Sequence, residues 1–453
     1  MKVILLSGGS GKRLWPLSND TRSKQFLRLL ASPSGEQESM VQRVVRQIVE
    51  SQITDSITLA TSNTQHDIIT NQLGASIDLV TEPERHDTFP AIALAVNFLL
   101  NERQCDPQEV IVVMPCDVYT EAGYFKAAAR MAEAAARDEA DIVLMGIRPT
   151  SGTTEFGYIV PGQPQKGQLA TPVQQFVEKP SRDRAAALLK EGAWWNAGVF
   201  AFKAAYLQNI VDRYVPSASF AQLRAQYGRL PRISFDYEVV EQAARLAFVS
   251  YSGQWKDIGT WDALAEELPT STIGRVTLAG EVDNTHAINE LDLPLLCVGT
   301  RDLVVAASPD GLLVAAKDAG EMIKDYVERM PARPMYEERR WGEYKVLNSV
   351  TFPDGHQILT KELRIAAGKG ISYQKHLHRD EVWTFVDGEG LLVIDDKVTR
   401  VGRGTVVNIV KGQMHAVKAL TPLTFIEVQS GDMLVEEDIL RFPWDWDAAE
   451  AAL

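Results

Sequence analysis

The sequence predicts an α/β fold for the N-terminal half, built on a parallel, doubly wound sheet, and an all-β C-terminal part. Short apolar runs rich in branched residues alternate with stretches whose apolar residues recur at helical spacing, as in residues 38–53. Such alternation of strands and helices is typical of parallel sheets. From about residue 270 short strands separated by Gly, Asp and Asn take over, which indicates a change of architecture.

The length of the chain indicates more than one domain. A chain of 453 residues is too long for one ordinary hydrophobic core. We expect an α/β domain at 1–268, a small β segment at 269–330, a linker at 331–340 and a β-barrel domain at 341–445. The linker is placed where charged residues surround Pro331 and Pro334.

Composition and charge exclude several classes of protein. The apolar fraction of 45% and the charged fraction of 23% are those of a globular protein. A formal net charge of −14 argues against wrapping nucleic acid, because phosphate binding needs a basic face. No apolar run approaches the roughly 20 residues that span a bilayer, so we expect no membrane insertion.

The N-terminus and the cysteines predict a cytoplasmic protein. Met1 and Lys2 lead straight into the first predicted strand, which leaves no room for a signal peptide. The three cysteines are odd in number and widely spaced, which favours reduced thiols over a disulfide framework.

A glycine-rich loop follows the first predicted strand, residues 3–6. Residues 7–11 read Ser-Gly-Gly-Ser-Gly, and such a loop can bring several backbone N–H groups close to an anion. Arg13 and Lys24 add positive charge at the strand end, where open α/β sheets bind ligands. The spacing fits neither a Walker motif nor the dinucleotide fingerprint. The loop is therefore either an ordinary turn or a cradle for a nucleoside triphosphate.

Longer motifs around this loop resemble the sugar-nucleotide pyrophosphorylases, in particular the mannose-1-phosphate guanylyltransferases. They are Gly-Gly-Ser-Gly-Lys-Arg-Leu-Trp-Pro-Leu at 8–17 and Lys-Gln-Phe at 24–26. The resemblance implies a Rossmann-like nucleotidyltransferase domain with a mixed sheet, in which Arg13 and Lys24 are catalytic. One departure is Ser23, where the family usually has proline. The resemblance also implies nucleotide-binding roles for Leu6, Gly8, Gly9, Gly11 and Lys12.

A second segment opens a predicted helix that runs through Leu100. Asp87 or Thr88 can cap this helix, and Pro90 suits its first turn. A loop that leads into a helix explains the segment by itself. Residues 81–91 also resemble the family segment that frames the guanine and ribose, which implies nucleotide contacts for Asp87, Thr88, Pro90 and Ala91. The family more often has asparagine at the position of Asp87.

Two aspartates are candidate Mg²⁺ ligands. Asp117 ends a buried strand at 110–117, a position that suits a metal between phosphates but also a helix N-cap. The family's Pro-x-Asp motif favours the metal. Asp257 lies in Trp-Lys-Asp-Ile-Gly-Thr-Trp, residues 255–261, which resembles the family's second metal loop. Two carboxylates with phosphate oxygens are a sufficient ligand set for Mg²⁺.

The motif Phe-Val-Glu-Lys-Pro at 176–180 places an acceptor beside a cation at a strand end. An exposed Glu-Lys pair is usually only a solvated charge pair, but Glu178 can also accept sugar hydroxyls and Lys179 can meet a phosphate. This motif and Trp-Asn-Ala-Gly-Val-Phe at 195–200 resemble the family's sugar-phosphate pocket. The resemblance implies that Glu178, Lys179, Asn196 and Gly157 contact the sugar phosphate.

The predicted C-terminal barrel contains a group of metal-ligand residue types. His376 and His378 are two residues apart, so on a strand both side chains would face one side. With Glu381 and His415 they supply three imidazoles and a carboxylate. This set suits Zn²⁺, Fe²⁺, Mn²⁺ or Ni²⁺, and the sequence does not choose among them. The alternative is a set of surface histidines.

The barrel resembles the cupin domain of type II phosphomannose isomerases fused to guanylyltransferases. Matching residues include Gln374, Arg379 and Glu427. Val410 replaces a proline usual in the second cupin motif, and residues 441–444 lack the Tyr-Gly-Arg ending of the bifunctional enzymes. The cupin is therefore either an isomerase or a structural or sugar-sensing module.

Together the resemblances imply transfer of GMP from GTP to mannose 1-phosphate, giving GDP-mannose and pyrophosphate. The alternative is a pyrophosphorylase with another base or sugar preference. The implied partners are GTP and mannose 1-phosphate, with Mg²⁺ and a divalent transition metal as cofactors. The sequence is compatible with a homodimer but does not set the oligomeric state.

Overall fold

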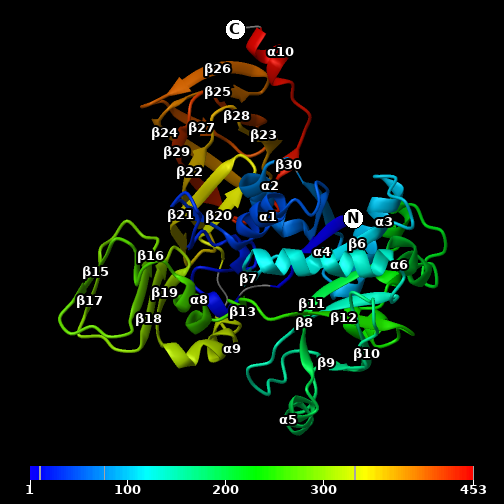
Figure 1. Ribbon diagram of the computed structural model, residues 1–453. Coiled ribbons are helices and arrows are strands. Elements are labelled where there is room, and N and C mark those ends of the chain that lie inside the picture. Colours follow the sequence, from blue (N-terminus) through cyan, green and yellow to red (C-terminus); the bar gives the residue numbers. More distant parts are fainter. Residues whose placement is uncertain (10–11, 76, 331–332, 452–453) are drawn as a thin grey trace. The chain divides into compact units, whose positions relative to one another are not determined.

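The computed structural model describes residues 1–9, 12–75, 77–330 and 333–451 (Figure 1). The chain divides into two compact units, each assembled from three stretches of sequence. The domain boundaries expected from the sequence stay a prediction. The first unit comprises residues 1–14, 23–271 and 316–324, and the second unit comprises residues 15–22, 272–315 and 325–453.

The first unit is organised around a mixed sheet, which confirms the predicted α/β fold and the mixed sheet that the resemblance implied. The parallel sheet predicted from the alternation of strands and helices is wrong, because β9, β10 and β11 pair antiparallel with their neighbours. Among the described residues nine strands form this sheet, in the order β5-β4-β1-β6-β11-β8-β12-β10-β9. The first strand pairs in parallel with β4 and β6, while β11 runs antiparallel to both β6 and β8. The strands are β1 (Lys2–Leu6), β4 (Ile57–Ser62), β5 (Asp78–Glu82), β6 (Val110–Pro115), β8 (Ile142–Ile147), β9 (Tyr158–Pro161), β10 (Thr171–Val177), β11 (Trp194–Lys203) and β12 (Leu246–Tyr251).

Helices connect these strands, and α3 lies at the centre of the core. Most of the side chains of α3 are apolar and buried, so it packs in the main hydrophobic cluster with residues of the sheet such as Ile111 and Phe200. The predicted helix at 38–53 is α1, and Ser39 opens it with a capping box. The helices are α1 (Met40–Ser51), α2 (His66–Leu73), α3 (Thr88–Asn101), α4 (Ala122–Ala136), α5 (Arg182–Lys190), α6 (Ala204–Val211), α7 (Phe220–Ala225), α8 (Trp261–Glu267), the 3-10 turns η1 (Lys12–Leu14), η2 (Lys24–Phe26), η3 (Asn63–Gln65) and η4 (Tyr227–Arg229), and the π-helical turn η5 (Asp236–Val240).

Two short antiparallel pairs lie outside the main sheet. The first joins β2 (Leu30–Ala31) to β3 (Gln37–Glu38). The second joins β7 (Val118–Thr120) to β13 (Trp255–Asp257), with Asp257 opposite Val118. This second pair brings together the ends of two segments that are far apart in sequence.

The small β segment of the second unit consists of short strands, as predicted. One sheet has the order β14-β16-β18-β19, and β15 pairs with β17. The pairs β14–β16 and β16–β18 are parallel. The strands are β14 (Thr272–Gly274), β15 (Val276–Ala279), β16 (His286–Asn289), β17 (Leu295–Val298), β18 (Leu303–Ser308) and β19 (Gly311–Ala316), followed along the chain by η6 (Lys317–Met322) and α9 (Ile323–Val327).

The C-terminal part is a barrel of two antiparallel sheets, in the orders β20-β21-β22-β29-β24-β27 and β26-β25-β28-β23-β30. Trp383, Phe385 and Phe425 fill its core. The stretch expected as a linker contains β20, which pairs with β21. The elements are β20 (Tyr336–Arg339), β21 (Gly342–Thr351), β22 (Gln357–Ile365), β23 (Gly370–Lys375), β24 (Arg379–Asp387), β25 (Glu389–Ile394), β26 (Lys397–Gly402), β27 (Val406–Ile409), β28 (His415–Ala419), β29 (Leu423–Gly431), β30 (Leu440–Arg441) and α10 (Trp446–Ala451).

Residues 15–22, near the start of the chain, belong to the second unit. The hydroxyl of Ser308 donates to the carbonyl oxygen of Pro16 at 2.6 Å. Asn19 Nδ2 donates to Asp310 Oδ2 at 2.7 Å. These contacts tie the segment between the glycine loop and Lys24 to the small β segment. Among the described residues no helix is long and apolar enough to cross a bilayer.

Two glycines of the barrel give a matched test of its backbone. Gly388 joins β24 to β25 with φ of +81°, and a Cβ there would lie 2.0 Å from the carbonyl oxygen of Pro422. Gly404 has φ of +87°, but its Cβ would meet no atom within 4 Å. We expect Gly404→Ala to lower the free energy of unfolding by about 1 kcal/mol, the cost of a left-handed alanine. Gly388→Ala should cost about 3 kcal/mol or more, because the backbone must also move.

Denaturant unfolding followed by tryptophan fluorescence measures both losses. Equal losses in the two variants would contradict the close approach at Gly388.

Candidate active site

The glycine loop leaves the carboxyl end of β1, where the sequence predicted a ligand site. Gly9 has φ of +89°, a conformation that favours glycine. The hydroxyl of Ser23 donates to the carbonyl oxygen of Gly9 at 2.9 Å, and Arg85 Nη2 donates to the same oxygen at 3.3 Å. Gly11 lies outside the described residues. The loop is thus held from two sides through one of its carbonyl groups.

A buried polar network, which the sequence analysis missed, lies beneath the loop. Gln65 accepts from the hydroxyl of Ser7 at 3.0 Å and donates to that of Ser23 at 2.7 Å. Gln25 donates to the hydroxyl of Ser7 at 2.9 Å. All four side chains are buried, and these hydrogen bonds fix their positions, although Gln25 Oε1 has no partner among the described residues. Ser23 therefore supplies hydrogen bonds that a proline at this position could not make.

Lys24 lies between the two predicted metal ligands. Its Nζ is 3.0 Å from Asp117 Oδ2 and 2.6 Å from Asp257 Oδ1. Asp117 directly precedes β7 and Asp257 ends β13, so the pairing of these strands brings the carboxylates together. Burial alone would lower the pKa of Lys24, but the two carboxylates outweigh it and raise the pKa. Lys24 is therefore positively charged at neutral pH.

The carboxylates of Asp117 and Asp257 fit a hard divalent cation. Both face one point, where they already hold a positive charge, and carboxylate oxygens are the ligands that Mg²⁺ prefers. Nearby, a Cβ on Gly259 would lie 3.0 Å from Asp257 Oδ1 and 3.0 Å from Lys24 Nζ. The glycine of the Trp-x-Asp-x-Gly-x-Trp motif thus leaves room for this group.

Arg13 and Lys12 lie in the short turn η1 that follows the loop. Arg13 is exposed and Lys12 is half-buried. Leu14, next to Arg13, lines the same small pocket as Lys24 and Asp117. Within the described part of the chain, no recorded contact joins Arg13 to either carboxylate. The roles of Arg13 and Lys12 stay predictions.

The segment at 81–91 forms the start of α3, as expected. Asp87 is the N-cap and accepts from the backbone N–H of Thr88 at 2.7 Å. Pro90 and Ala91 are buried in the first turns. Thr88 Oγ1 accepts from the backbone N–H of Phe235 at 2.8 Å. Asp87 itself is exposed, and the nucleotide contacts of this segment stay predictions.

Glu178 is buried, and one of its oxygens has no partner. The side chain is 7% exposed, and among the described residues no group donates a hydrogen bond to Oε2. A Cβ on Gly157 would lie 2.4 Å from this oxygen, so an alanine there would force the Glu178 carboxyl to move. Lys179 Nζ is 3.9 Å from Glu178 Oε1. Glu178 and Lys179 therefore do not form the fully solvated charge pair that was one interpretation of the sequence. Oε2 of Glu178 is an acceptor without a partner among the described residues.

Asn196 lies on β11 and is held by Asp236, which opens η5. Asn196 Nδ2 donates to Asp236 Oδ1 at 2.7 Å, and Asn196 Oδ1 accepts from the backbone N–H of Gly198 at 3.2 Å. Burial raises the pKa of Asp236 to about 6. Burial, with a smaller contribution from the charge of Asp236, raises the pKa of Glu178 to about 7. Two neighbouring acidic groups therefore both have raised pKa values.

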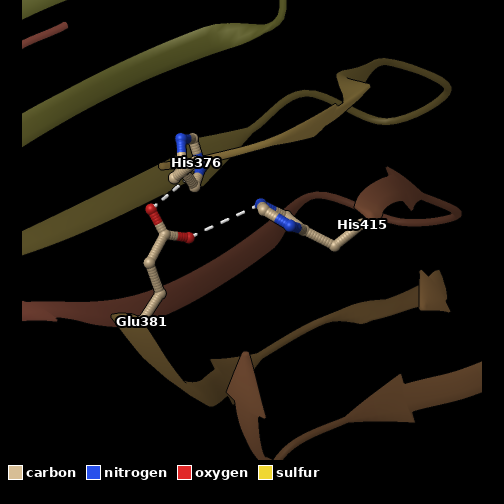
Figure 2. A group of neighbouring side chains, drawn as sticks. All are labelled: His376, Glu381 and His415. Carbon is tan, nitrogen blue, oxygen red and sulfur yellow. Dashed lines mark ion pairs between the residues drawn. The ribbon is translucent and has the colours of Figure 1, made fainter. Parts of the chain in front are cut away.

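The barrel brings together three of its four predicted metal ligands (Figure 2). Glu381 on β24 has Oε1 3.2 Å from His376 Nε2 and Oε2 3.6 Å from His415 Nε2. All three side chains are buried. The strand predicted for His376 and His378 is wrong, because β23 ends at Lys375 and β24 begins at Arg379. His378 lies outside the group, 41% exposed, with Nδ1 3.4 Å from Asp432 Oδ1.

The hydrogen bonds of the two buried histidines fit a transition metal. His376 Nδ1 lies 2.6 Å from the carbonyl oxygen of Asp438, and His415 Nδ1 lies 3.0 Å from that of Gln413. A carbonyl oxygen can only accept, so each Nδ1 carries the proton and each Nε2 keeps its lone pair. Burial lowers the pKa of both rings, that of His376 to about 4, so both are neutral. His415 Nε2 has no hydrogen-bond partner among the described residues.

Arg379 lies beside this group. Its Nε donates to Glu381 Oε1 at 2.8 Å, and its Nη2 is 3.4 Å from His376 Nε2. Trp383 Nε1 lies within hydrogen-bond distance of both Glu381 and Glu427. The residues that carry the cupin resemblance thus line one interior site.

The raised pKa of Glu178 predicts a pH-dependent stability. The folded state favours the protonated carboxyl up to about pH 7, whereas the unfolded chain ionises it near its ordinary value of 4.5. The stabilisation is complete below the ordinary pKa and is lost as the pH rises through about 7. Between pH 4.5 and 7 the free energy of unfolding of the wild type should therefore fall, relative to that of Glu178→Gln.

Urea unfolding across this pH range tests the prediction, with Glu155→Gln, at an exposed position, as the control. Parallel curves for the wild type and Glu178→Gln would show that Glu178 titrates normally.

Comparison with known proteins shows which families the two parts of the chain match. Residues 2–272 match the family of nucleotidyl transferases, and residues 332–443 match the mannose-6-phosphate isomerase C-terminal family. A mannose-1-phosphate guanylyltransferase of Sinorhizobium fredii is 30% identical over 97% of this chain and 91% of its own length. One of Escherichia coli is 30% identical over 97% of both chains.

A solved structure supports the same relationship. The crystal structure titled mannose-1-phosphate geranyltransferase from Thermus thermophilus is 30% identical, with a TM-score of 0.60. The match covers 73% of this chain and 99% of the solved one. On these matches, the chain belongs to the mannose-1-phosphate guanylyltransferase family of nucleotidyltransferase enzymes.

Proposed function

We propose that this enzyme transfers GMP from GTP to mannose 1-phosphate in the cytoplasm. A phosphate oxygen of mannose 1-phosphate forms a bond to the α-phosphorus of GTP. The bond from that phosphorus to the bridging oxygen of the β-phosphate breaks, so GDP-mannose and pyrophosphate are the products. The observation that carries the proposal is the convergence of Lys24, Asp117 and Asp257 at the strand ends beside the glycine loop.

Such a reaction needs positioning and charge neutralisation more than a protein nucleophile, because the attacking phosphate is already anionic. Mg²⁺, when held by Asp117 and Asp257, would offset the charge on the leaving pyrophosphate. Lys24 supplies a permanent positive charge next to these carboxylates. Arg13, exposed in the turn after the loop, is the second cation that we assign to the phosphates.

Glu178 and Asn196 are the groups that we assign to the sugar. The free Oε2 of Glu178 is a buried acceptor, and such an atom gains most from a hydroxyl donor. Asp236 fixes the amide of Asn196, which sets the direction in which that side chain can meet a ligand. A buried carboxyl is costly without a hydrogen-bond partner, so Glu178 favours a ligand with hydroxyl groups over an apolar ligand.

The decisive assay is pyrophosphate release from GTP on addition of mannose 1-phosphate. Asp117→Ala and Arg13→Ala should each lower turnover by about 10²-fold or more, since each removes charge stabilisation of the leaving group. Arg224→Ala, an exposed arginine on α7, is the matched control and should keep wild-type turnover. Near-normal turnover in either test variant, with the fold intact by circular dichroism, would refute the role of that residue.

A panel of nucleoside triphosphates and hexose 1-phosphates decides between this proposal and another base or sugar preference. Faster turnover with a different pair of substrates would favour the alternative.

A second candidate function is interconversion of fructose 6-phosphate and mannose 6-phosphate in the barrel. It is favoured by the buried group of His376, Glu381 and His415, whose two Nε2 atoms and carboxylate face one another. A Zn²⁺, Fe²⁺, Mn²⁺ or Ni²⁺ ion held there would polarise substrate oxygens. If no isomerase activity accompanies the metal, the barrel is a structural or sugar-sensing module.

Metal content and isomerase turnover test the barrel site together. His376→Ala and His415→Ala should each lose the bound metal and the isomerase activity, because each removes a ligand. His378→Ala is the matched control, since this exposed histidine lies outside the group. Wild-type metal content in His415→Ala would contradict the site, and metal without turnover in the wild type would favour the structural module.

A further inference from the structure

The second unit contains a cavity that the proposed reaction does not use. Its volume is about 230 Å³. The small β segment contributes Glu290 and Asp292, the barrel contributes Tyr336 and Glu343, and residues 15–22 contribute Arg22. This volume is below the roughly 300–1,000 Å³ of sites for drug-sized ligands, and therefore suits a smaller molecule.

Arg22 lines this cavity and is paired with Glu290. The side chain is 10% exposed, and its two terminal nitrogens donate to Glu290 at 2.8 and 2.9 Å. Its guanidinium carbon lies 5.0 Å from the centre of the Tyr336 ring. The buried Nε–H has no hydrogen-bond partner among the described residues. Such a donor is costly to leave unpaired, while both terminal nitrogens are already paired with Glu290, so a ligand in the cavity would meet the Arg22–Glu290 pair rather than a free guanidinium group.

The wall of the cavity is strongly polar but offers no unopposed positive charge. Of its lining residues three are basic and four are acidic. Lys345 Nζ is 3.3 Å from Asp292 Oδ2. Arg364 is 3.6 Å from Glu343 and 2.6 Å from Glu362. A phosphate group would meet several carboxylates here, which disfavours an anionic ligand.

A neutral molecule with many hydroxyl groups matches this wall. Each hydroxyl both donates and accepts, so it can bridge the paired carboxylates and guanidinium groups without a change in charge. Tyr336 and Tyr344 add aromatic groups to this polar lining. We propose that this cavity binds a neutral sugar of hexose size. The proposal is independent of the transferase reaction.

Ligand-detected saturation-transfer NMR on the full chain tests this, with D-mannose and D-glucose as probes. We expect saturable binding with a dissociation constant of roughly 1–10 mM, as suits a small ligand held by a few hydrogen bonds. Glu343→Gln and Arg364→Ala should each weaken binding about 10-fold, the loss for one charge-assisted hydrogen bond. Arg403→Ala, at an exposed position of the barrel, should bind as the wild type does.

Asn196→Ala distinguishes binding in this cavity from binding at the sugar site proposed for the first unit. Hexose binding that survives in Asn196→Ala but weakens in both cavity variants supports the proposal. Binding that is lost in Asn196→Ala and kept in Glu343→Gln would overturn it, as would the absence of saturable binding below about 50 mM. Pyrophosphate release, measured separately, reports on the transferase whichever result is found.

Discussion

The ion-pair group of Lys24, Asp117 and Asp257 is the interaction on which the site depends. It exists because β7 and β13 pair and place Asp257 opposite Val118, one residue after Asp117. Two carboxylates that both lie within 3.0 Å of one nitrogen would repel each other in a partly buried site, and the charge of Lys24 offsets that repulsion. The polar network under the glycine loop then holds the segment that carries Lys24. The pairing of β7 with β13 therefore brings two negative charges together, and the positive charge of Lys24 lies between them.

The sequence predicted the parts of this site that have a periodic or motif signature. Branched apolar runs located β1 and β6, and a carboxylate at the end of β6 pointed to Asp117. The hydrogen bonds of Gln65 with Ser23 and Ser7 were not predictable, because they join side chains 42 and 58 residues apart and follow no period. The role of Asp236 was not predictable either, because it depends on one hydrogen bond from Asn196.

In the barrel, the spacing of two histidines mispredicts where their side chains lie. Two histidines at spacing two share a face only while the strand continues, and here it ends at Lys375. Asp438 then accepts from the backbone N–H groups of Leu377 and His378, so this loop has its own hydrogen bonds. His376 turns inward to Glu381 and His378 remains exposed. No pattern in the sequence marks that end of the strand.

The place of residues 15–22 in the second unit has a consequence for synthesis on the ribosome. The glycine loop and Lys24 flank this segment, but its partners Ser308 and Asp310 are translated almost three hundred residues later. N-terminal regions generally fold first as the chain emerges. Here the contacts of Pro16 and Asn19 with the small β segment cannot form until that segment leaves the exit tunnel. Final placement of the segment between the glycine loop and Lys24 is thus coupled to translation of a later part of the chain.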